Sequence, residues 1–332
     1  MTPDVSASHA DWRPTCSLEL LHARSELLQQ VRQFFLTRDF LEVETPLLSH
    51  DSVIDRHLDP LSVTLFPDPR RPEEGKKLWL QTSPEFGMKR LLAAGATSIF
   101  QISKAFRGAE VGERHNIEFT MLEWYRVGDD YAAGRQLLAD LAGEILGANV
   151  EMLTYAAAFQ QHLGVDPHRA SGNELLSVAL QSKVPTPDSY DGSDRDLLLE
   201  LLLTELIEPH LGAAAPTILY DYPASQAALA QVSRGDPPVA ERFELYVHGM
   251  ELANGYHELL DAKLLRERNQ KNNQARSEDG KHRLPEASRL LDAMEYGLPA
   301  CSGTALGMDR LLMVKTGARS LADVLSFPID RA

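Results

Sequence analysis

The sequence predicts an α+β fold in which an antiparallel sheet is flanked by helices. Three observations favour this fold. Alternating apolar and polar residues, typical of strands, occur in the first third of the chain and again near residues 241–253. Residues 18–38 carry apolar side chains at helical intervals. No stretch of the sequence repeats an earlier one. We expect a single domain over residues 1–332, with a mainly helical insertion near residues 131–215.

Composition limits the classes of function. The chain has 332 residues, 43% of them hydrophobic and 24% charged, which is ordinary for a globular protein with a large core. We find no apolar run of membrane-spanning length and no secretory signal, so no membrane association is expected. Cys16 and Cys301 are too few for a disulfide framework, and the expected location is therefore the reducing cytoplasm.

The net charge of −15 weighs against a groove for long nucleic acid, which usually carries a basic patch. An acidic chain fits a small cationic substrate or a basic protein partner better.

The first half of the chain alternates helical and strand patterns. The predicted elements are a helix over residues 18–38, a short strand that ends at Pro46, a strand, turn and helix over residues 77–95, and a hairpin of strands over residues 98–108 and 116–126.

The second half begins with the predicted insertion, which we expect to be scaffold. The elements predicted there are helices over residues 131–215, broken by a surface loop at 183–196, a strand and loop over 216–231, a hairpin running into a helix over 240–263, and a glycine-punctuated strand feeding a helix over 301–317.

The strand at residues 116–126 directs a carboxylate along an apolar face. Alternation places five side chains on that face: Ile117, Phe119, Met121, Glu123 and Tyr125. Phe119 and Glu123 are about 13 Å apart at roughly 3.3 Å per residue, a span comparable to an aminoacyl-adenylate with its adenine on Phe119. The alternative is a half-buried strand with a glutamate at its edge.

The hairpin near residues 241–253 brings two carboxylates close together. If His248-Gly249 form a two-residue turn, Glu244 pairs with Ala253, and Glu244 and Glu251 are diagonal neighbours roughly 7–8 Å apart. Such carboxylates repel unless a cation lies between them, and Mg²⁺ bound to a nucleotide accepts one or two carboxylates. The alternative is an exposed acidic strand face.

Two arginines lie where strands meet loops or helices. Arg107 ends its strand, and Arg310 lies in the first helical turn after "GTALGMD". A guanidinium donates two hydrogen bonds at once to a phosphate, so both arginines are candidates for a triphosphate site. The alternative for each is a surface ion pair.

Five ordered blocks resemble the class II aminoacyl-tRNA synthetases, most closely the catalytic core of lysyl-tRNA synthetase. "FLEVETPLL" is similar to motif 1, "FRGAEVGERHNIEFTMLEWY" to motif 2 and "GTALGMDRLLM" to motif 3, and "TSPEFGMKRLL" and "ERFELYVHGMELANGYHELLDA" match as well. The resemblance spans nearly the whole chain. It implies the catalytic fold of that family and a homodimer formed through motif 1, which contains Pro46.

The resemblance also implies a site for ATP, Mg²⁺ and an amino acid. Arg107 would act at the α-phosphate and Arg310 at the γ-phosphate, as catalytic residues. The other implied ATP-binding residues are Gly108, Ala109, Glu110, His115, Asn116, Phe119, Glu251, Leu252 and Gly307. Glu244 and Glu251 would bind Mg²⁺.

The same resemblance implies how the amino acid is held. Its backbone end would face Ser83, Pro84, Glu85 and Ala305, and its ε-ammonium would face Glu123, Tyr125 and Glu258. A charge-assisted hydrogen bond is worth roughly 1.5–3 kcal/mol, so a substrate without the terminal amine would leave these acids unpaired. The glutamate of the strand is thus interpreted as the partner of a substrate cation.

Three departures from the family modify these expectations. Too few residues precede Pro46 for the anticodon-binding barrel of lysyl-tRNA synthetases, so stable tRNA binding is not expected. The motif 2 signature Phe-Arg-x-Glu has Ala109 in place of the glutamate, which Glu110 would supply after a local slip. Ala305 stands where glycine is usual, and its methyl group should reposition the amino group of the substrate.

A synthetase-like core without the barrel, with "MELANGYHEL" and "CSGTALG", is similar to ligases that modify a protein. This resemblance implies activation of (R)-β-lysine or lysine and its transfer to a lysine of elongation factor P. Two rivals remain: a truncated lysyl-tRNA synthetase and a synthetase-like amino-acid sensor without catalysis.

Overall fold

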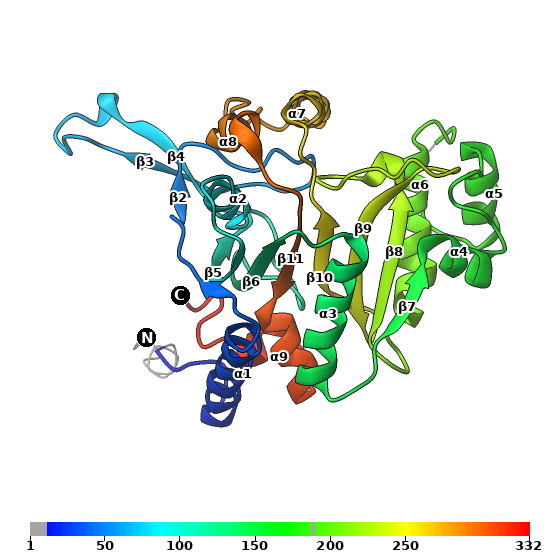
Figure 1. Ribbon diagram of the computed structural model, residues 1–332, viewed down its shortest axis with the longest axis horizontal. Coiled ribbons are helices and arrows are strands. Elements are labelled where there is room, and N and C mark those ends of the chain that lie inside the picture. Colours follow the sequence, from blue (N-terminus) through cyan, green and yellow to red (C-terminus); the bar gives the residue numbers. More distant parts are fainter. Residues whose placement is uncertain (1–11, 187–189) are drawn as a thin grey trace, which may run out of the picture. The chain divides into compact units, whose positions relative to one another are not determined.

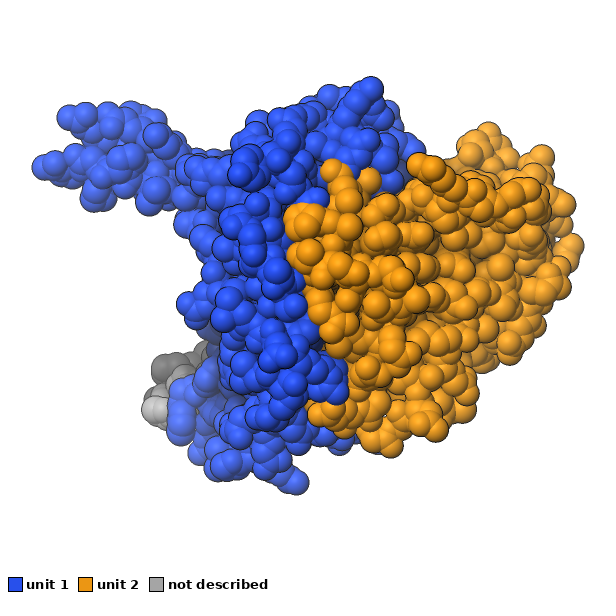
Figure 2. All heavy atoms as spheres, in the orientation of Figure 1, with its two compact units in different colours: residues 1–125, 261–298, 305–332 blue, residues 126–260, 299–304 orange. Residues whose placement is uncertain are grey.

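The computed structural model describes residues 12–186 and 190–332, which divide into two compact units (Figures 1 and 2). Unit 1 comprises the described residues up to Tyr125 together with Asp261–Leu298 and Ala305–Ala332. Unit 2 comprises Arg126–Leu260 and Pro299–Thr304. Within the described residues, no helix combines the length and apolar character needed to cross a membrane.

Unit 1 contains most of the predicted helices and strands of the two chain ends. They are α1 (Leu18–Leu36), β1 (Leu41–Glu42), β2 (Leu48–Ser49), β3 (Ser62–Leu65), β4 (Lys76–Leu80), α2 (Glu85–Ala93), β5 (Ser98–Phe106), α7 (Ala262–Glu278), α8 (Arg289–Gly297), α9 (Met308–Thr316) and α10 (Leu321–Val324). Two further strands, β6 (Glu118–Val127) and β11 (Cys301–Gly307), carry the chain from one unit into the other.

The strand predicted to end at Pro46 is shorter than expected. Only Leu41–Glu42 and Leu48–Ser49 are strands, and they belong to different sheets. Proline lacks the N–H that a ladder needs, and β1 pairs in parallel with β5 only through Leu41 and Glu42. β2 and β3 instead flank β4 in an antiparallel sheet, whose β3–β4 hairpin extends as an arm of unit 1 (Figure 1).

Aromatic side chains of α1 and β5 pack against β6. The ring of Phe35, on α1, stacks on Phe100 of β5 with 4.8 Å between ring centroids, and it lies 5.2 Å from Trp124 of β6. α1 begins at the N-cap Ser17, whose hydroxyl accepts a hydrogen bond from the Leu20 amide. Because α1, β5 and β6 share this buried core, the backbone around Glu123 is rigidly placed.

Unit 2 contains the predicted helical insertion and a meander of strands. Its elements are α3 (Tyr131–Leu146), β7 (Glu151–Thr154), α4 (Tyr155–Leu163), α5 (Gly172–Gln181), α6 (Arg195–Leu202), β8 (Thr217–Pro223), β9 (Val239–Val247) and β10 (Met250–His257).

The strands of unit 2 follow the order β10-β9-β8-β7. β8, β9 and β10 are antiparallel neighbours, whereas β7, which the sequence did not predict, pairs in parallel with β8. The helices of the insertion enclose one apolar core that includes Tyr155, Phe159 and Leu198. Part of the loop predicted at 183–196 lies outside the described residues, and its end is already helical from Arg195.

Candidate active site

A buried carboxylate group occupies the centre of β6. Glu123 is 1% exposed. The Ser83 hydroxyl donates to its Oε2 at 2.6 Å, and the Tyr125 hydroxyl donates to its Oε1 at 2.6 Å. The structure therefore brings together three of the residues predicted to hold the amino acid, and both partners of the carboxylate are neutral.

A buried ion pair adjoins this group. Lys89 Nζ lies 2.5 Å from Glu85 Oε1 and 5.9 Å from the centre of the Tyr125 ring, and both charged side chains are buried. Glu85 opens α2, and its amide donates to the Ser83 hydroxyl at 3.0 Å. Sequence analysis missed Lys89, although its spacing of four from Glu85 on a predicted helix was a usable signal.

The pKa of Glu123 is raised to about 8, first by burial and then by the neighbouring charge of Glu85. Hydrogen bonds from Ser83 and Tyr125 and the charge of Lys89 oppose this shift without cancelling it. An acid in this setting gains much from a cationic ligand, because such a ligand adds the positive charge that favours its ionised form. Glu258, the other acid predicted here, is buried in unit 2, and its meeting with Glu123 stays a prediction.

The predicted phosphate end of the site lies on the loop between β5 and β6. The guanidinium of Arg107 lies 5.1 Å from the centre of the Phe119 ring and 4.0 Å from a carboxylate oxygen of Glu110. Its Nε is buried, and within the described residues it has no hydrogen-bond acceptor. A buried N–H of this kind fits an anionic oxygen such as that of a phosphate.

Ala109 has a left-handed backbone, with φ of +63°. This conformation is uncommon for a residue with a Cβ, and here it places a sharp bend directly after Arg107-Gly108. Glu110 follows the bend and reaches Arg107. The structure thus gives Glu110 a contact within the predicted site, while its replacement of the motif 2 glutamate remains a prediction.

Arg310 joins the same loop from α9. Its Nη2 donates to His115 Nε2 at 2.7 Å, and its Nε donates to the Arg114 carbonyl at 3.2 Å. Burial and then the charge of Arg310 lower the pKa of His115, so the ring is neutral and accepts this hydrogen bond. The predicted ATP residues His115 and Arg310 are therefore neighbours.

The side-chain amide of Asn116 forms hydrogen bonds with two backbone groups. Its Nδ2 donates to the Glu118 carbonyl at 2.6 Å, and its Oδ1 accepts from the Ile329 amide at 3.0 Å. This side chain ties the C-terminal segment to the start of β6, and its direct contact with ATP stays a prediction. Asp309, which sequence analysis missed, similarly accepts from the Thr120 amide at 2.8 Å and from the guanidinium of Arg24.

The hairpin of β9 and β10 has the predicted turn but a different register. His248 and Gly249 have φ of +50° and +66°, as a two-residue type I′ turn requires, and Glu251 pairs with Tyr246. The predicted pairing of Glu244 with Ala253 is wrong. A bulge between Glu251 and Ala253 shifts the register, so that Glu244 pairs with Asn254.

The bulge determines which residues share a face. Strand alternation with one inserted residue places Asn254, Tyr256 and then Glu258 on the face of Glu244, whereas an uninterrupted strand would place them on the opposite face. The two carboxylates Glu244 and Glu258 thus belong to the same side of the hairpin because of a single extra residue.

Glu244 is 3% exposed and fully hydrogen-bonded. Its Oε1 accepts from Asn254 at 3.0 Å and from Arg242, and its Oε2 accepts from Tyr222 at 2.5 Å and from Tyr246 at 2.6 Å. Four donors use about the full acceptor capacity of a carboxylate. As a ligand of Mg²⁺, Glu244 would have to release one of them, and the binding of Mg²⁺ by Glu244 and Glu251 stays a prediction.

The remaining predicted site residues lie at helix N-caps or within strands. Pro84 is the N-cap of α2, Gly307 the N-cap of α9, Leu252 is buried in β10, and Ala305 is half-buried in β11. Their contacts with a substrate stay predictions.

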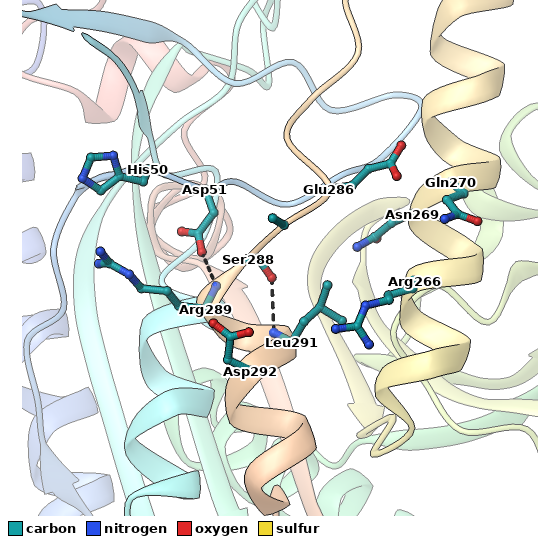
Figure 3. A pocket seen from close by; sticks show the side chains of 11 residues that line it. His50, Asp51, Arg266, Asn269, Gln270, Glu286, Ser288, Arg289, Leu291 and Asp292 are labelled. Atoms are coloured by element: carbon teal, nitrogen blue, oxygen red, sulfur yellow. Dashed lines mark hydrogen bonds between the residues drawn. The ribbon is translucent and has the colours of Figure 1, made fainter.

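A pocket of about 530 Å³ lies elsewhere in unit 1 (Figure 3). Its wall is made by α7, by residues 286–292 at and before the start of α8, and by His50-Asp51, and it includes none of the predicted site residues. Asp51 Oδ2 accepts from the Arg289 amide at 2.9 Å and Ser288 Oγ accepts from the Leu291 amide at 3.2 Å, so the start of α8 is already capped.

Comparison with known proteins gives consistent matches. The family model described as tRNA synthetases class II (D, K and N) matches residues 3–331. Proteins named elongation factor P–(R)-β-lysine ligase from Salmonella paratyphi B and Salmonella schwarzengrund are each 47% identical over 325 residues, which cover 97% of this chain and 99% of theirs.

Proposed function

The chain belongs to the class II tRNA synthetases of the D, K and N type, and from this premise we propose that it is an ATP-dependent ligase for (R)-β-lysine. It would activate the amino acid as an adenylate and transfer it to a lysine ε-amine of elongation factor P. The names and the coverage of its relatives support this proposal. The observation that carries it is Glu123, a buried carboxylate with only neutral hydrogen-bond partners, which matches a substrate ammonium.

The first step joins the amino acid to ATP. The substrate carboxylate attacks the α-phosphorus, an acyl–phosphate bond forms, and the bond to pyrophosphate breaks. Arg107 would stabilise negative charge at the α-phosphate through its buried Nε, and Arg310 would turn from His115 to the γ-phosphate. The ring of Phe119, close to Arg107, would receive the adenine.

The second step transfers the acyl group to the acceptor. The uncharged amine of an acceptor lysine attacks the carbonyl carbon of the adenylate, an amide forms, AMP leaves, and the amine loses its proton to solvent or a nearby base. We assign no residue as that base. Because the mixed anhydride is already activated, alignment of the amine supplies much of the rate.

The family implies ATP, and Mg²⁺ would accompany its phosphates. Glu251 fits this ion, since carboxylates together with phosphate oxygens are its usual ligands. Glu244, with four donors on its carboxylate, would support the hairpin or act as a second ligand after releasing one donor.

We further propose a homodimer that forms through motif 1. Apolar side chains are exposed along this region of unit 1, among them Leu36, Leu41 and Leu48, at 52%, 62% and 37%. A second copy would cover them, because apolar side chains exposed in one subunit are often buried where two subunits associate. Light scattering coupled to size-exclusion chromatography tests this, and a monomer at micromolar concentration would refute it.

The direct test is mass spectrometry of elongation factor P after incubation with this protein, ATP and (R)-β-lysine. The proposal predicts one added lysyl unit on a single lysine, absent without ATP. ATP–pyrophosphate exchange in the same experiment separates a catalyst from an amino-acid sensor. Charging of tRNA at a rate above modification of the factor would instead favour a truncated lysyl-tRNA synthetase.

The choice between (R)-β-lysine and L-α-lysine tests a second part of the proposal. Ala305 has a methyl group where related lysyl-tRNA synthetases usually have glycine, and this methyl group would favour an amino group at the β-carbon. Binding of both isomers to the parent and to Ala305→Gly is the measurement. An unchanged preference removes Ala305 from the explanation.

A further inference from the structure

The segment 54–59 has no helix or strand of its own, and side chains from α7 and the turn after it hold its backbone. These side chains donate to carbonyl groups that no ladder satisfies. The pairs are Asn272 with Ile54 (3.0 Å), Arg276 with Asp55 and with Leu58 (2.9 Å each), and Lys281 with Arg56 (3.0 Å).

Arg276 is the centre of this arrangement. Its side chain is 4% exposed, and besides the two carbonyls it donates to Asp59 Oδ1 at 2.9 Å and to the His282 carbonyl at 3.0 Å. Lys281 donates to the second carboxylate oxygen of Asp59 at 2.8 Å. Asp59 is thus fixed through its side chain by two cations.

The carbonyl of Asp59 in turn fixes the loop that carries Arg107. It accepts from the Gly108 amide at 2.6 Å, and a Cβ on Gly108 would lie 3.0 Å from the same oxygen, so a larger residue would press on this carbonyl. The Arg107 amide donates to the Ile117 carbonyl at 2.9 Å. The backbone on either side of the Arg107 Cα is therefore held by two separate segments.

We propose that Arg276 is a positioning residue for Arg107: it holds segment 54–59, whose Asp59 carbonyl sets the Gly108 amide and with it the direction of the Arg107 side chain. The assignment rests on the proposed function, because it takes Arg107 as the residue that meets the phosphates of ATP. In this role Arg276 acts through segment 54–59, by its bonds to the Asp55 and Leu58 carbonyls and to the Asp59 carboxylate.

Hydrogen exchange in the free protein tests the mechanical part without any activity. In Arg276→Gln, the Gly108 amide should exchange about tenfold faster than in the parent, because its acceptor is no longer fixed. The matched control is Arg56→Gln, which removes an exposed ion pair with Asp279 from the same segment and should leave Gly108 protected. Unchanged protection of Gly108 in Arg276→Gln would overturn the inference.

Steady-state kinetics of ATP–pyrophosphate exchange tests the functional part. Arg276→Gln should lose roughly 10–100-fold in kcat/KM for ATP, whereas KM for the amino acid stays within about twofold, because Glu123 is held by other contacts. Arg276→Lys should recover part of the loss. Equal losses for both substrates, or none, would contradict the assignment.

Two further sets of variants test the positioning role of Arg276. If Arg276→Gln does not fold, Asp59→Asn, which weakens the contacts with Arg276 and Lys281, and Lys281→Met, which removes the contacts with Asp59 and the Arg56 carbonyl, should show the same selective loss in smaller degree. In an Arg107→Ala background, Arg276→Gln should add little further loss, and a full additional loss would refute action through Arg107. A parent without exchange activity would refute the proposed function, while the hydrogen-exchange result would still decide the positioning.

Discussion

Two buried glutamates, one in each unit, are stabilised in opposite ways. Glu123 of β6 is 1% exposed and accepts hydrogen bonds from two neutral hydroxyl groups, with the carboxylate of Glu85 nearby. Glu244 of β9 is 3% exposed and accepts from two hydroxyl groups, an amide and the guanidinium of Arg242. Both are almost fully buried, but among the described contacts only Glu244 is hydrogen-bonded to a cation, whereas Lys89 acts on Glu123 without a hydrogen bond to it.

This difference distinguishes a carboxylate that stabilises the fold from one that is suited to bind a ligand. A buried anion with a resident cation and a full set of donors is satisfied within the fold. A buried acid with neutral donors is costly to ionise until a cation arrives, and it can therefore convert binding of an ammonium group into specificity. On this basis we assign amine recognition to Glu123 and support of the β9–β10 hairpin to Glu244.

The largest effect is expected from removing the cation of Glu244. Arg242→Met should reduce the free energy of unfolding by about 3–5 kcal/mol, because it leaves a buried charge without its partner. Urea unfolding followed by circular dichroism measures this. Arg169→Met is the control, since the Arg169 side chain is 59% exposed and its ion pairs should contribute less than about 1 kcal/mol. Equal losses in the two variants would contradict the comparison.

A smaller effect, on activity instead of stability, is expected at Glu123. Glu123→Gln should lower kcat/KM for the amino acid roughly 100-fold in pyrophosphate exchange, because the ammonium loses its charged partner, while KM for ATP changes little. Glu118→Gln, on the same strand but exposed and paired with Lys104, should behave as the parent. Parent-like use of lysine by Glu123→Gln would show that the amine is bound elsewhere.

Binding of the amine should depend on pH in a defined direction. The pKa of Glu123 is about 8, so the free protein holds a proton there at neutral pH and must release it to bind an ammonium. Affinity should therefore rise with pH, approaching a factor of about ten per unit, and level off near pH 8. Calorimetry between pH 6 and 9 measures this, with Glu123→Gln expected to be flat. A parent affinity that falls as the pH rises toward 8 is incompatible with the assignment.

The smallest effect is expected from one neutral donor of Glu244. Tyr246→Phe removes a hydroxyl that lies 2.6 Å from Glu244 Oε2 and 3.0 Å from Glu208 Oε1, but it leaves Arg242 and the other donors of Glu244, so the free energy of unfolding should fall by only about 1 kcal/mol. Thermal and urea unfolding measure this change. A loss as large as that of Arg242→Met would mean that the hydroxyl, and not the guanidinium, is the main support of the carboxylate.

The sequence was sufficient for features that depend on local pattern. Alternation predicted the strand of Glu123, and the two-residue turn at His248-Gly249 was recognisable from its residues. Arg242 and Lys89 were also accessible, because they lie two and four residues from acids on one strand face and one helix face.

Other features could not be predicted, either because the local sequence pattern was ambiguous or because the feature joins distant parts of the chain. The bulge falls within "ELAN", where two adjacent apolar residues gave no indication of which one is inserted. Asp59 and Arg276 are separated by 217 residues, and only the folded chain joins them. The predicted pairing of Glu244 failed for the first reason, and the support of Gly108 was missed for the second.

The extra residue in β10 has a practical consequence for protein engineering. A chimera that imports this hairpin from a relative must preserve its length between Glu251 and Asn254, even where the individual side chains are exchanged freely. A deletion of one residue there would conserve every acidic group in an alignment and still send Glu258 to the wrong side of the sheet.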